Sequence, residues 1–207
     1  MIIVECEQGS EDWHAVRLGI PTASEFSRIV TKTGRLSTQR DDYIAELCVE
    51  YVYGEPYREF QGNYWTERGI DLEAEAMAYY ELDRAQRGER VGFVFRDEQR
   101  DVGCSPDFLV GDDGLCEMKC PAPKTHLKWL LKPEPPTDHA QQLQGQLWVT
   151  GRQWVDWLSY CPGLPPVLHR IYPDFALQHA LDEHMPAFLD ELANGKAFLR
   201  SLGYEAA

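Results

Sequence analysis

The sequence predicts a mixed α/β fold, in which short buried strands are combined with amphipathic helices. Apolar residues at helical spacing predict helices over residues 9–17, 22–30, 41–53, 66–82, 124–131, 137–151 and 175–202. Short apolar runs predict strands over residues 91–95, 100–104, 108–110, 115–118, 153–160 and 167–172. Within the last helix, Pro186 predicts an interruption, since proline removes a backbone donor.

Length and composition predict one domain spanning residues 1–207. No apolar run approaches the ~20 residues of a membrane span, and the N-terminus lacks the pattern of a signal peptide. We therefore expect a cytoplasmic protein without a membrane partner. The six cysteines form no CxxC pair, so we expect reduced core residues rather than ligands of zinc or of an iron–sulfur cluster.

The net charge of −14 argues at first against a nucleic-acid partner. The charges are unevenly distributed, however. Residues 17–40 hold five basic residues and one acid, and residues 119–132 hold four lysines and no acid. Two basic strips in an acidic chain are typical of a nuclease groove, and also of ordinary solvated faces.

A β-hairpin is predicted about the turn at residues 111–114, Gly-Asp-Asp-Gly, which two short apolar runs flank. Because side chains alternate along a strand, Glu117 and Lys119 share one face. The hairpin also brings Asp107, at the start of its first strand, back toward them. The sequence thus predicts a cluster of two carboxylates and one ammonium group.

This cluster suits a metal-dependent hydrolase. Two carboxylates within about 4 Å of each other repel by roughly 4 kcal/mol at an effective dielectric constant near 20, so a cation between them is expected. Hard oxygen ligands suit Mg²⁺ or Mn²⁺. The lysine could orient or deprotonate a water molecule, or offset charge on a scissile phosphate. The alternative is a solvated hairpin face with an incidental ion pair.

A second candidate site lies near the N-terminus. Thr22 and Glu25 have capping-box spacing, which predicts a helix whose free N–H groups, with Ser24 and Arg17 nearby, would bind a terminal phosphate. The alternative is that Thr22 only caps the helix and Ser24 is a surface hydroxyl.

Two helices offer further polar candidates. Glu73 lies at the edge of an apolar stripe and is either a third carboxylate of the site or a solvated residue. Glutamines cluster on the helix over residues 137–151, where they either bind phosphate oxygens or form plain helix surface; these are Gln141, Gln142, Gln144 and Gln146.

Four ordered blocks resemble the lambda exonuclease family of YqaJ-type phage recombinases, a branch of the PD-(D/E)XK nuclease superfamily. The blocks are Trp13-His-x-x-Arg-Leu-Gly19 with Thr22-Ala-Ser24; Gly69-x-x-x-Glu73; Cys104-Ser-Pro-Asp107 with Glu117-Met-Lys-Cys-Pro121; and Gln142-Leu-Gln-x-x-Leu-Trp-Val-Thr150. The resemblance extends from about residue 9 to residue 172. It implies a central mixed β-sheet flanked by helices, as in restriction endonucleases.

The resemblance also implies roles for these residues. It places metal ions, Mg²⁺ or else Mn²⁺ and two per site, on Asp107, Glu117 and Glu73, and it makes Lys119 the group that assists the water. It further implies a pocket for a 5′-phosphate, formed by Arg17, Ser24, Ser105 and Gln142.

The activity implied is 5′-to-3′ digestion of one strand of linear double-stranded DNA, which leaves a 3′ overhang for recombination. The implied partners are duplex ends with a 5′-phosphate and a single-strand annealing protein, and the implied assembly is a homotrimeric ring. Two alternatives remain open: an endonuclease of the same superfamily that needs no end, and a non-catalytic DNA-binding module.

Overall fold

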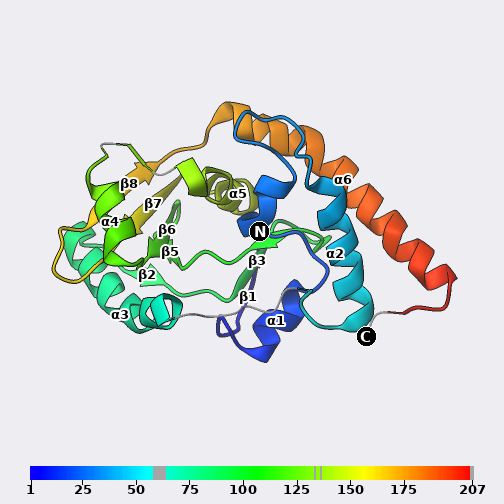
Figure 1. The fold of residues 1–207 in the computed structure, drawn as a ribbon, viewed down its shortest axis with the longest axis horizontal. Helices are drawn as coiled ribbons and strands as arrows, with labels where there is room; N and C mark the ends of the chain where they lie inside the picture. The colour runs from blue at the N-terminus through cyan, green and yellow to red at the C-terminus, as the bar shows by residue number, and fades with distance from the viewer. Residues whose placement is uncertain (58–63, 133, 136, 206–207) are drawn as a thin grey trace.

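The chain folds around two β-sheets, the larger of which has helices on both faces (Figure 1). The computed structural model describes residues 1–57, 64–132, 134–135 and 137–205. Its elements in chain order are β1 (Ile2–Val4), α1 (Glu11–Arg17), the 3-10 helix η1 (Ala23–Arg28), α2 (Arg40–Tyr53), α3 (Tyr64–Arg84), β2 (Gly88–Glu89), β3 (Phe93–Phe95), β4 (Gly103–Cys104), β5 (Phe108–Val110), β6 (Gly114–Lys119), α4 (Pro123–Leu130), the 3-10 helix η2 (Thr137–His139), α5 (Ala140–Thr150), β7 (Trp154–Ser159), β8 (Val167–Ile171) and α6 (Phe175–Ser201).

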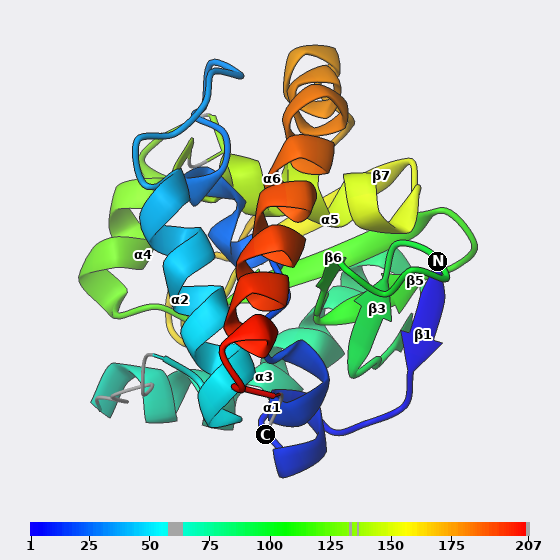
Figure 2. The ribbon, with the colours of Figure 1, turned by 90° about the vertical axis from the view of Figure 1, so that its right-hand side faces the viewer.

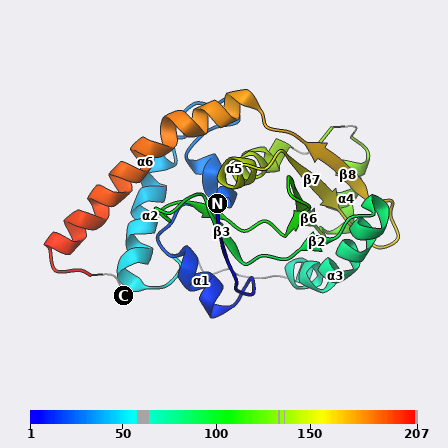
Figure 3. The ribbon, with the colours of Figure 1, turned by 180° about the vertical axis from the view of Figure 1, so that it is seen from behind.

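The larger sheet has five strands in the order β2-β5-β6-β7-β8. Its neighbours are antiparallel except for β6 and β7, which run parallel. The smaller sheet, β1-β3-β4, is antiparallel throughout. The helices α3 and α5 lie on opposite sides of the larger sheet (Figures 1 and 3). The predicted mixed α/β fold is therefore confirmed, with the strands divided between two sheets.

The central strand β6 is enclosed on both faces. Leu115 packs in one apolar cluster with Leu143 and Leu147 of α5. Its neighbour Cys116 packs in a second cluster with Tyr80 of α3. All of these side chains are buried. A polar side chain on β6 is therefore largely removed from bulk water.

The long helix α6 packs alongside α2 (Figure 2), where the rings of Tyr43 and Phe188 are 5.6 Å apart. It runs unbroken through Pro186, so the predicted interruption is wrong. Pro186 is exposed, whereas Met185 and Phe188 are buried and hold the flanking turns on the core. This burial outweighs the lost backbone hydrogen bond. Within the part of the chain that the structure describes, no helix is long and apolar enough to cross a membrane.

The helix predicted after Thr22 is the short 3-10 helix η1, and its predicted capping box does not form. The Thr22 hydroxyl lies 3.1 Å from the Ser24 hydroxyl, and the Thr22 N–H donates to the Tyr43 hydroxyl at 3.2 Å. Packing rather than capping holds η1 in place. It lies against α5 at Gly145, where a Cβ atom would be 2.5 Å from the Phe26 ring.

The short strands β1 to β4 differ most from the strands that the sequence predicts. β3 and β4 are shorter than the strands predicted over residues 91–95 and 100–104. The sequence pattern predicts neither β1 nor β2, which have only three and two residues. Such short strands show no periodicity, and they form because a distant strand is available for pairing, as Ile2 pairs with Phe95.

The cysteines behave as core residues. All six are free thiols, and Cys104, Cys116 and Cys161 are buried.

A buried ion cluster fastens α3 to the larger sheet. The Asp156 side chain on β7 is fully buried. Its carboxylate accepts hydrogen bonds from Arg170 Nε and Nη2, both at 2.8 Å, and from the Tyr80 hydroxyl at 2.9 Å. Tyr80 lies two turns beyond Glu73 on α3, so this cluster also fixes the position of Glu73 relative to the sheet.

We expect Asp156→Ala to lower the free energy of unfolding by about 1–3 kcal/mol, because it leaves the buried Tyr80 hydroxyl without its acceptor and removes the partner of Arg170. Urea denaturation followed by circular dichroism measures the change. Asp182→Ala is the control, because Asp182 also accepts from a tryptophan and an arginine but is exposed. It should cost less than about 1 kcal/mol. Equal losses in both variants would contradict the anchoring role.

Candidate active site

The buried carboxylate of Glu117 is the centre of the site. Glu117 lies on β6 and is 2% exposed. Its Oε1 atom accepts from Lys119 Nζ at 2.6 Å and from Gln142 Nε2 at 2.7 Å. Its Oε2 atom accepts from Gln146 Nε2 at 2.7 Å. Three donors therefore fix both oxygens of one buried carboxylate.

Asp107 lies beside this carboxylate, and the predicted hairpin is confirmed. The register of β5 and β6 pairs Phe108 with Cys116, so continuing it places Asp107 opposite Glu117. The Asp107 Oδ2 atom accepts from the Met118 N–H at 2.6 Å. Burial raises the pKa of the Asp107 carboxyl to about 8, and the charge of Glu117 contributes to this rise. The site therefore holds more negative charge than its surroundings stabilise.

Lys119 is the cation nearest to both acids. Burial lowers its pKa, but the charges of Glu117 and Asp107 outweigh burial and hold the pKa above its usual value. This shift favours the ammonium form, which can stabilise negative charge beside the two acids.

Glu73 lies within electrostatic reach of these groups without touching them. Its side chain is 41% exposed, and its Oε2 atom is 3.7 Å from Nη2 of Arg90. Burial raises the pKa of Glu73, while the charges of Arg90 and Lys119 lower it. The structure thus joins Glu117 and Lys119 by an ion pair, places Asp107 opposite Glu117 within electrostatic reach of both, and leaves Glu73 at the margin, paired with an arginine.

The residues present fit a hard divalent cation. Two of the acids are adjacent, their oxygens are hard donors, and a cation would offset the charge that raises the pKa of Asp107. Among the residues that the structure describes, no three His, Cys, Asp or Glu side chains already form a metal-binding group. A metal bound here would therefore draw its remaining ligands from water, substrate or a moved side chain.

Of the four residues predicted to bind a phosphate, two are joined by Trp13. The guanidinium carbon of Arg17 is 3.7 Å from the centre of the Trp13 ring, and Trp13 Nε1 donates to the Ser105 hydroxyl at 2.9 Å. Ser24 is exposed and contacts Thr22, whose backbone bridges to Gly103 near Ser105.

The fourth residue, Gln142, stands apart from this group, because its amide binds the Glu117 carboxylate. The residues of the single predicted pocket therefore take part in two sets of contacts, one around Trp13 and the other around Glu117.

The residue roles that sequence reasoning missed are those of Gln146 and Trp13. Gln146 is four residues after Gln142, so both side chains project from one face of α5 toward Glu117. The spacing alone contains this signal. For Trp13, the sequence signal is weaker, because only the structure shows which acceptor its indole N–H binds and which cation lies over its ring.

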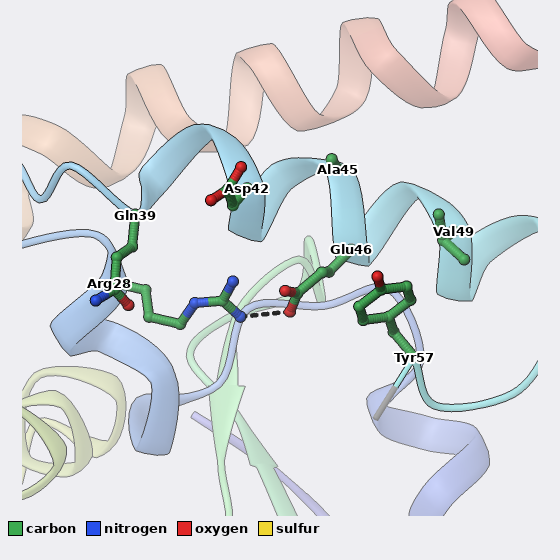
Figure 4. A pocket seen from close by; sticks show the side chains of 7 residues that line it. All are labelled: Arg28, Gln39, Asp42, Ala45, Glu46, Val49 and Tyr57. Atoms are coloured by element: carbon green, nitrogen blue, oxygen red, sulfur yellow. Dashed lines mark hydrogen bonds and ion pairs between the residues drawn. The ribbon is translucent and has the colours of Figure 1, made fainter. Parts of the chain in front are cut away.

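The basic strip over residues 17–40 is partly neutralised by local ion pairs. A cavity of about 560 Å³ lies between η1, α2 and Tyr57. Arg28 and Glu46 both line it and form an ion pair at 2.5 Å; the pair is drawn as a dashed line in Figure 4. Arg40 pairs with Glu191 on α6, also at 2.5 Å. These arginines stabilise the packing of helices. The basic strip is therefore interrupted at Arg28 and Arg40, whose charges are paired with acids.

Comparison with known proteins identifies relatives of this arrangement. The model of the YqaJ-like viral recombinase domain matches residues 12–153. The chain is 34% identical to an alkaline exonuclease, LHK-Exo, from Laribacter hongkongensis, with a TM-score of 0.81 over 94% of this chain and 98% of that one. The same coverage and TM-score, at 35% identity, are found for LHK-Exo in complex with dAMP.

A phage-related exonuclease from Haemophilus somnus 129PT shares the fold. It is 17% identical, with a TM-score of 0.62 over 84% of this chain and 95% of that chain. No curated protein sequence matches the chain. The extent of the family match and the identity to LHK-Exo agree with the four ordered sequence blocks. The chain therefore belongs to the family of YqaJ-like viral recombinase domains.

Proposed function

We propose that the protein is a metal-dependent exonuclease that digests one strand of linear double-stranded DNA from its 5′ end. The product would be a duplex with a 3′ single-stranded overhang, suited to recombination by strand annealing. The observation that carries the proposal is the pairing of Asp107 opposite the buried Glu117 on neighbouring strands, with Lys119 bound to Glu117. The relationship to LHK-Exo, an alkaline exonuclease that binds dAMP, supports it.

In this proposal Asp107 and Glu117 hold Mg²⁺ or Mn²⁺, two ions in all, and Glu73 completes the ligand set. The bound metal would polarise the scissile phosphate and lower the pKa of the attacking water. Gln142 and Gln146 keep both Glu117 oxygens oriented. Lys119 stays protonated and offsets the negative charge that develops on the phosphate.

The direction of digestion would follow from recognition of the 5′ end. Arg17 supplies a guanidinium group and Ser105 a hydroxyl, and both are held by Trp13. Ser24 would supply a further donor to the same phosphate, and Gln142 would do so after its amide turns away from Glu117. Anchoring a 5′-phosphate here presents the first phosphodiester bond to the carboxylates.

The assembly and partners extend this proposal. A single nuclease domain is supported by the match to 98% of the LHK-Exo chain. A homotrimeric ring around the duplex would place basic residues inside and the acidic excess outside, consistent with the net charge of −14. A single-strand annealing protein would take over the exposed 3′ strand.

The substrate is tested with linear duplexes that differ only in a 5′-phosphate or 5′-hydroxyl and are labelled at the 3′ end, beside a closed circular duplex. With Mg²⁺, we expect faster loss of the phosphorylated strand, an intact labelled partner strand and an intact circle. Nicking of the circle would favour an endonuclease. Equal rates at both ends would remove the proposed roles of Arg17, Ser24, Ser105 and Gln142.

The catalytic roles are tested by substitution. Asp107→Ala and Glu117→Ala should lower turnover by at least about 10²–10³-fold, because each removes a ligand of the metal that would act at the reacting phosphate. Lys119→Arg should retain more activity than Lys119→Gln, because the positive charge suffices. Asp112→Ala, in the exposed turn of the same hairpin, is the control. Near-normal activity of Asp107→Ala, with unchanged circular dichroism, would reject the proposal.

Without divalent cations, Asp107→Asn should be more stable than the wild type, increasingly so as pH rises. The folded-state pKa of Asp107 is raised to about 8. Wild-type stability is therefore lost as pH rises from the unfolded pKa toward this value. We expect a gain of at least about 1.4 kcal/mol at pH 9, equivalent to one pKa unit. Urea unfolding in EDTA at pH 5 and pH 9 measures it. A difference in the free energy of unfolding that is the same at pH 5 and pH 9 would contradict the raised pKa of Asp107.

A further inference from the structure

Trp13 makes two contacts that converge on residues of the proposed 5′-phosphate site. Its ring lies under the Arg17 guanidinium, with 3.7 Å between the guanidinium carbon and the ring centre. Its Nε1 atom donates to the Ser105 hydroxyl at 2.9 Å and to the Gly92 carbonyl at 3.1 Å. Arg17 and Ser105 are far apart in the sequence, and this one side chain links them.

The contact with Ser105 determines what that hydroxyl can do. An indole N–H is a donor only, so the Ser105 oxygen must act as the acceptor in this hydrogen bond. The hydroxyl hydrogen of Ser105 is then free to point toward a ligand. Trp13 therefore makes Ser105 a hydrogen-bond donor, which is the role that a phosphate oxygen requires.

The contact with Trp13 orients the Arg17 guanidinium, which has few polar partners within the described chain. The Nε atom of Arg17 is buried and has no hydrogen-bond partner among the described residues. Burial lowers the pKa of Arg17. Within the described chain no carboxylate forms an ion pair with Arg17, unlike Arg28 and Arg40. The guanidinium group thus lies over the Trp13 ring and can bind an anion.

Trp13 itself is firmly placed. Its backbone N–H donates to the Ser10 hydroxyl at 3.2 Å, the N-cap contact of α1. The Gly92 carbonyl holds the other end of the side chain, next to β3. The tryptophan therefore fixes α1 against the smaller sheet while its ring face contacts Arg17 and its N–H contacts Ser105.

We propose that Trp13 is a positioning residue that sets the preference of the nuclease for a 5′-phosphorylated DNA end. Its ring orients the Arg17 guanidinium, and its N–H makes the Ser105 hydroxyl a donor. A terminal phosphate monoester engages both groups, whereas a 5′-hydroxyl engages neither. This inference rests on the proposed function, because it concerns the same 5′-phosphate site.

The test compares kcat/KM for two linear duplexes that differ only in a 5′-phosphate or a 5′-hydroxyl. Trp13→Leu should lower the phosphate-to-hydroxyl ratio by about tenfold, the effect of losing a cation–π contact and a hydrogen bond together. Trp13→Phe keeps the ring and loses only the N–H, so the loss should be smaller, about threefold. In both variants the rate on the phosphorylated end should fall more than the rate on the hydroxyl end.

Trp148→Phe is the matched control. The Arg96 guanidinium carbon is 3.3 Å from the centre of the Trp148 ring, and Trp148 Nε1 donates to Asp182 at 2.7 Å. This variant thus loses the same kind of N–H at a tryptophan beneath an arginine, but its contacts are with Arg96 and Asp182 rather than with Arg17 and Ser105. Its phosphate-to-hydroxyl ratio should equal that of the wild type.

A double variant shows whether Trp13 acts through Arg17. If it does, Arg17→Ala combined with Trp13→Leu should reduce the ratio by much less than the product of the two single effects. Full multiplication of the two effects would overturn the positioning role.

The remaining outcomes separate this inference from the proposed function. A wild type that digests both ends at equal rates overturns this inference and the 5′-phosphate site, whereas a wild type that digests neither end overturns the proposed function itself. A wild type with the preference and a Trp13→Leu variant that retains it overturns only the role of Trp13. Equal losses of Trp13→Leu on both ends, with a lowered Tm, would make the residue merely structural and would also overturn the inference.

Discussion

The buried negative charge of Glu117 is the constraint on which the rest of the structure depends. A carboxylate that is 2% exposed is costly unless charged and polar partners surround it. Lys119 on the same strand and two glutamines on α5 supply three donors to its two oxygens. The adjacent Asp107 then adds a second acid, which these donors do not neutralise. A site in this electrostatic state is suited to bind a cation and an anionic substrate together.

The surrounding elements hold this arrangement by packing. Gly145 lets η1 approach α5 closely, so the helix that carries Gln142 and Gln146 is fixed relative to the N-terminal segment. On the other face of the sheet, the Asp156 cluster fastens α3, which carries Glu73. α1 is tied to β3 through Trp13. Segments far apart in the sequence therefore meet around one strand, and the proposed substrate contacts lie on separate elements joined by defined hydrogen bonds.

Local sequence patterns predict the hairpin, the amphipathic helices and the convergence of Asp107, Glu117 and Lys119, because each depends on neighbours within a few residues. The patterns fail where contacts between residues far apart in the sequence determine the local structure. Pro186 does not break α6, since burial on both sides holds it, and Thr22 forms no capping box because Tyr43 takes its N–H. The pairing of Arg28 and Arg40 with distant acids likewise cannot be read from a run of basic residues. The roles of Gln146 and Trp13 emerge only when the opposing atoms are known.

The central claim is that Asp107 and Glu117 gather in a buried position in order to hold a divalent cation. Diffraction from crystals soaked in Mn²⁺, recorded near the manganese absorption edge, tests it most directly because the ion is located without reference to activity. We expect an anomalous peak in contact with carboxylate oxygens of both Asp107 and Glu117. A manganese ion bound elsewhere, or no peak and an intact Glu117–Lys119 contact at saturating Mn²⁺, would contradict it.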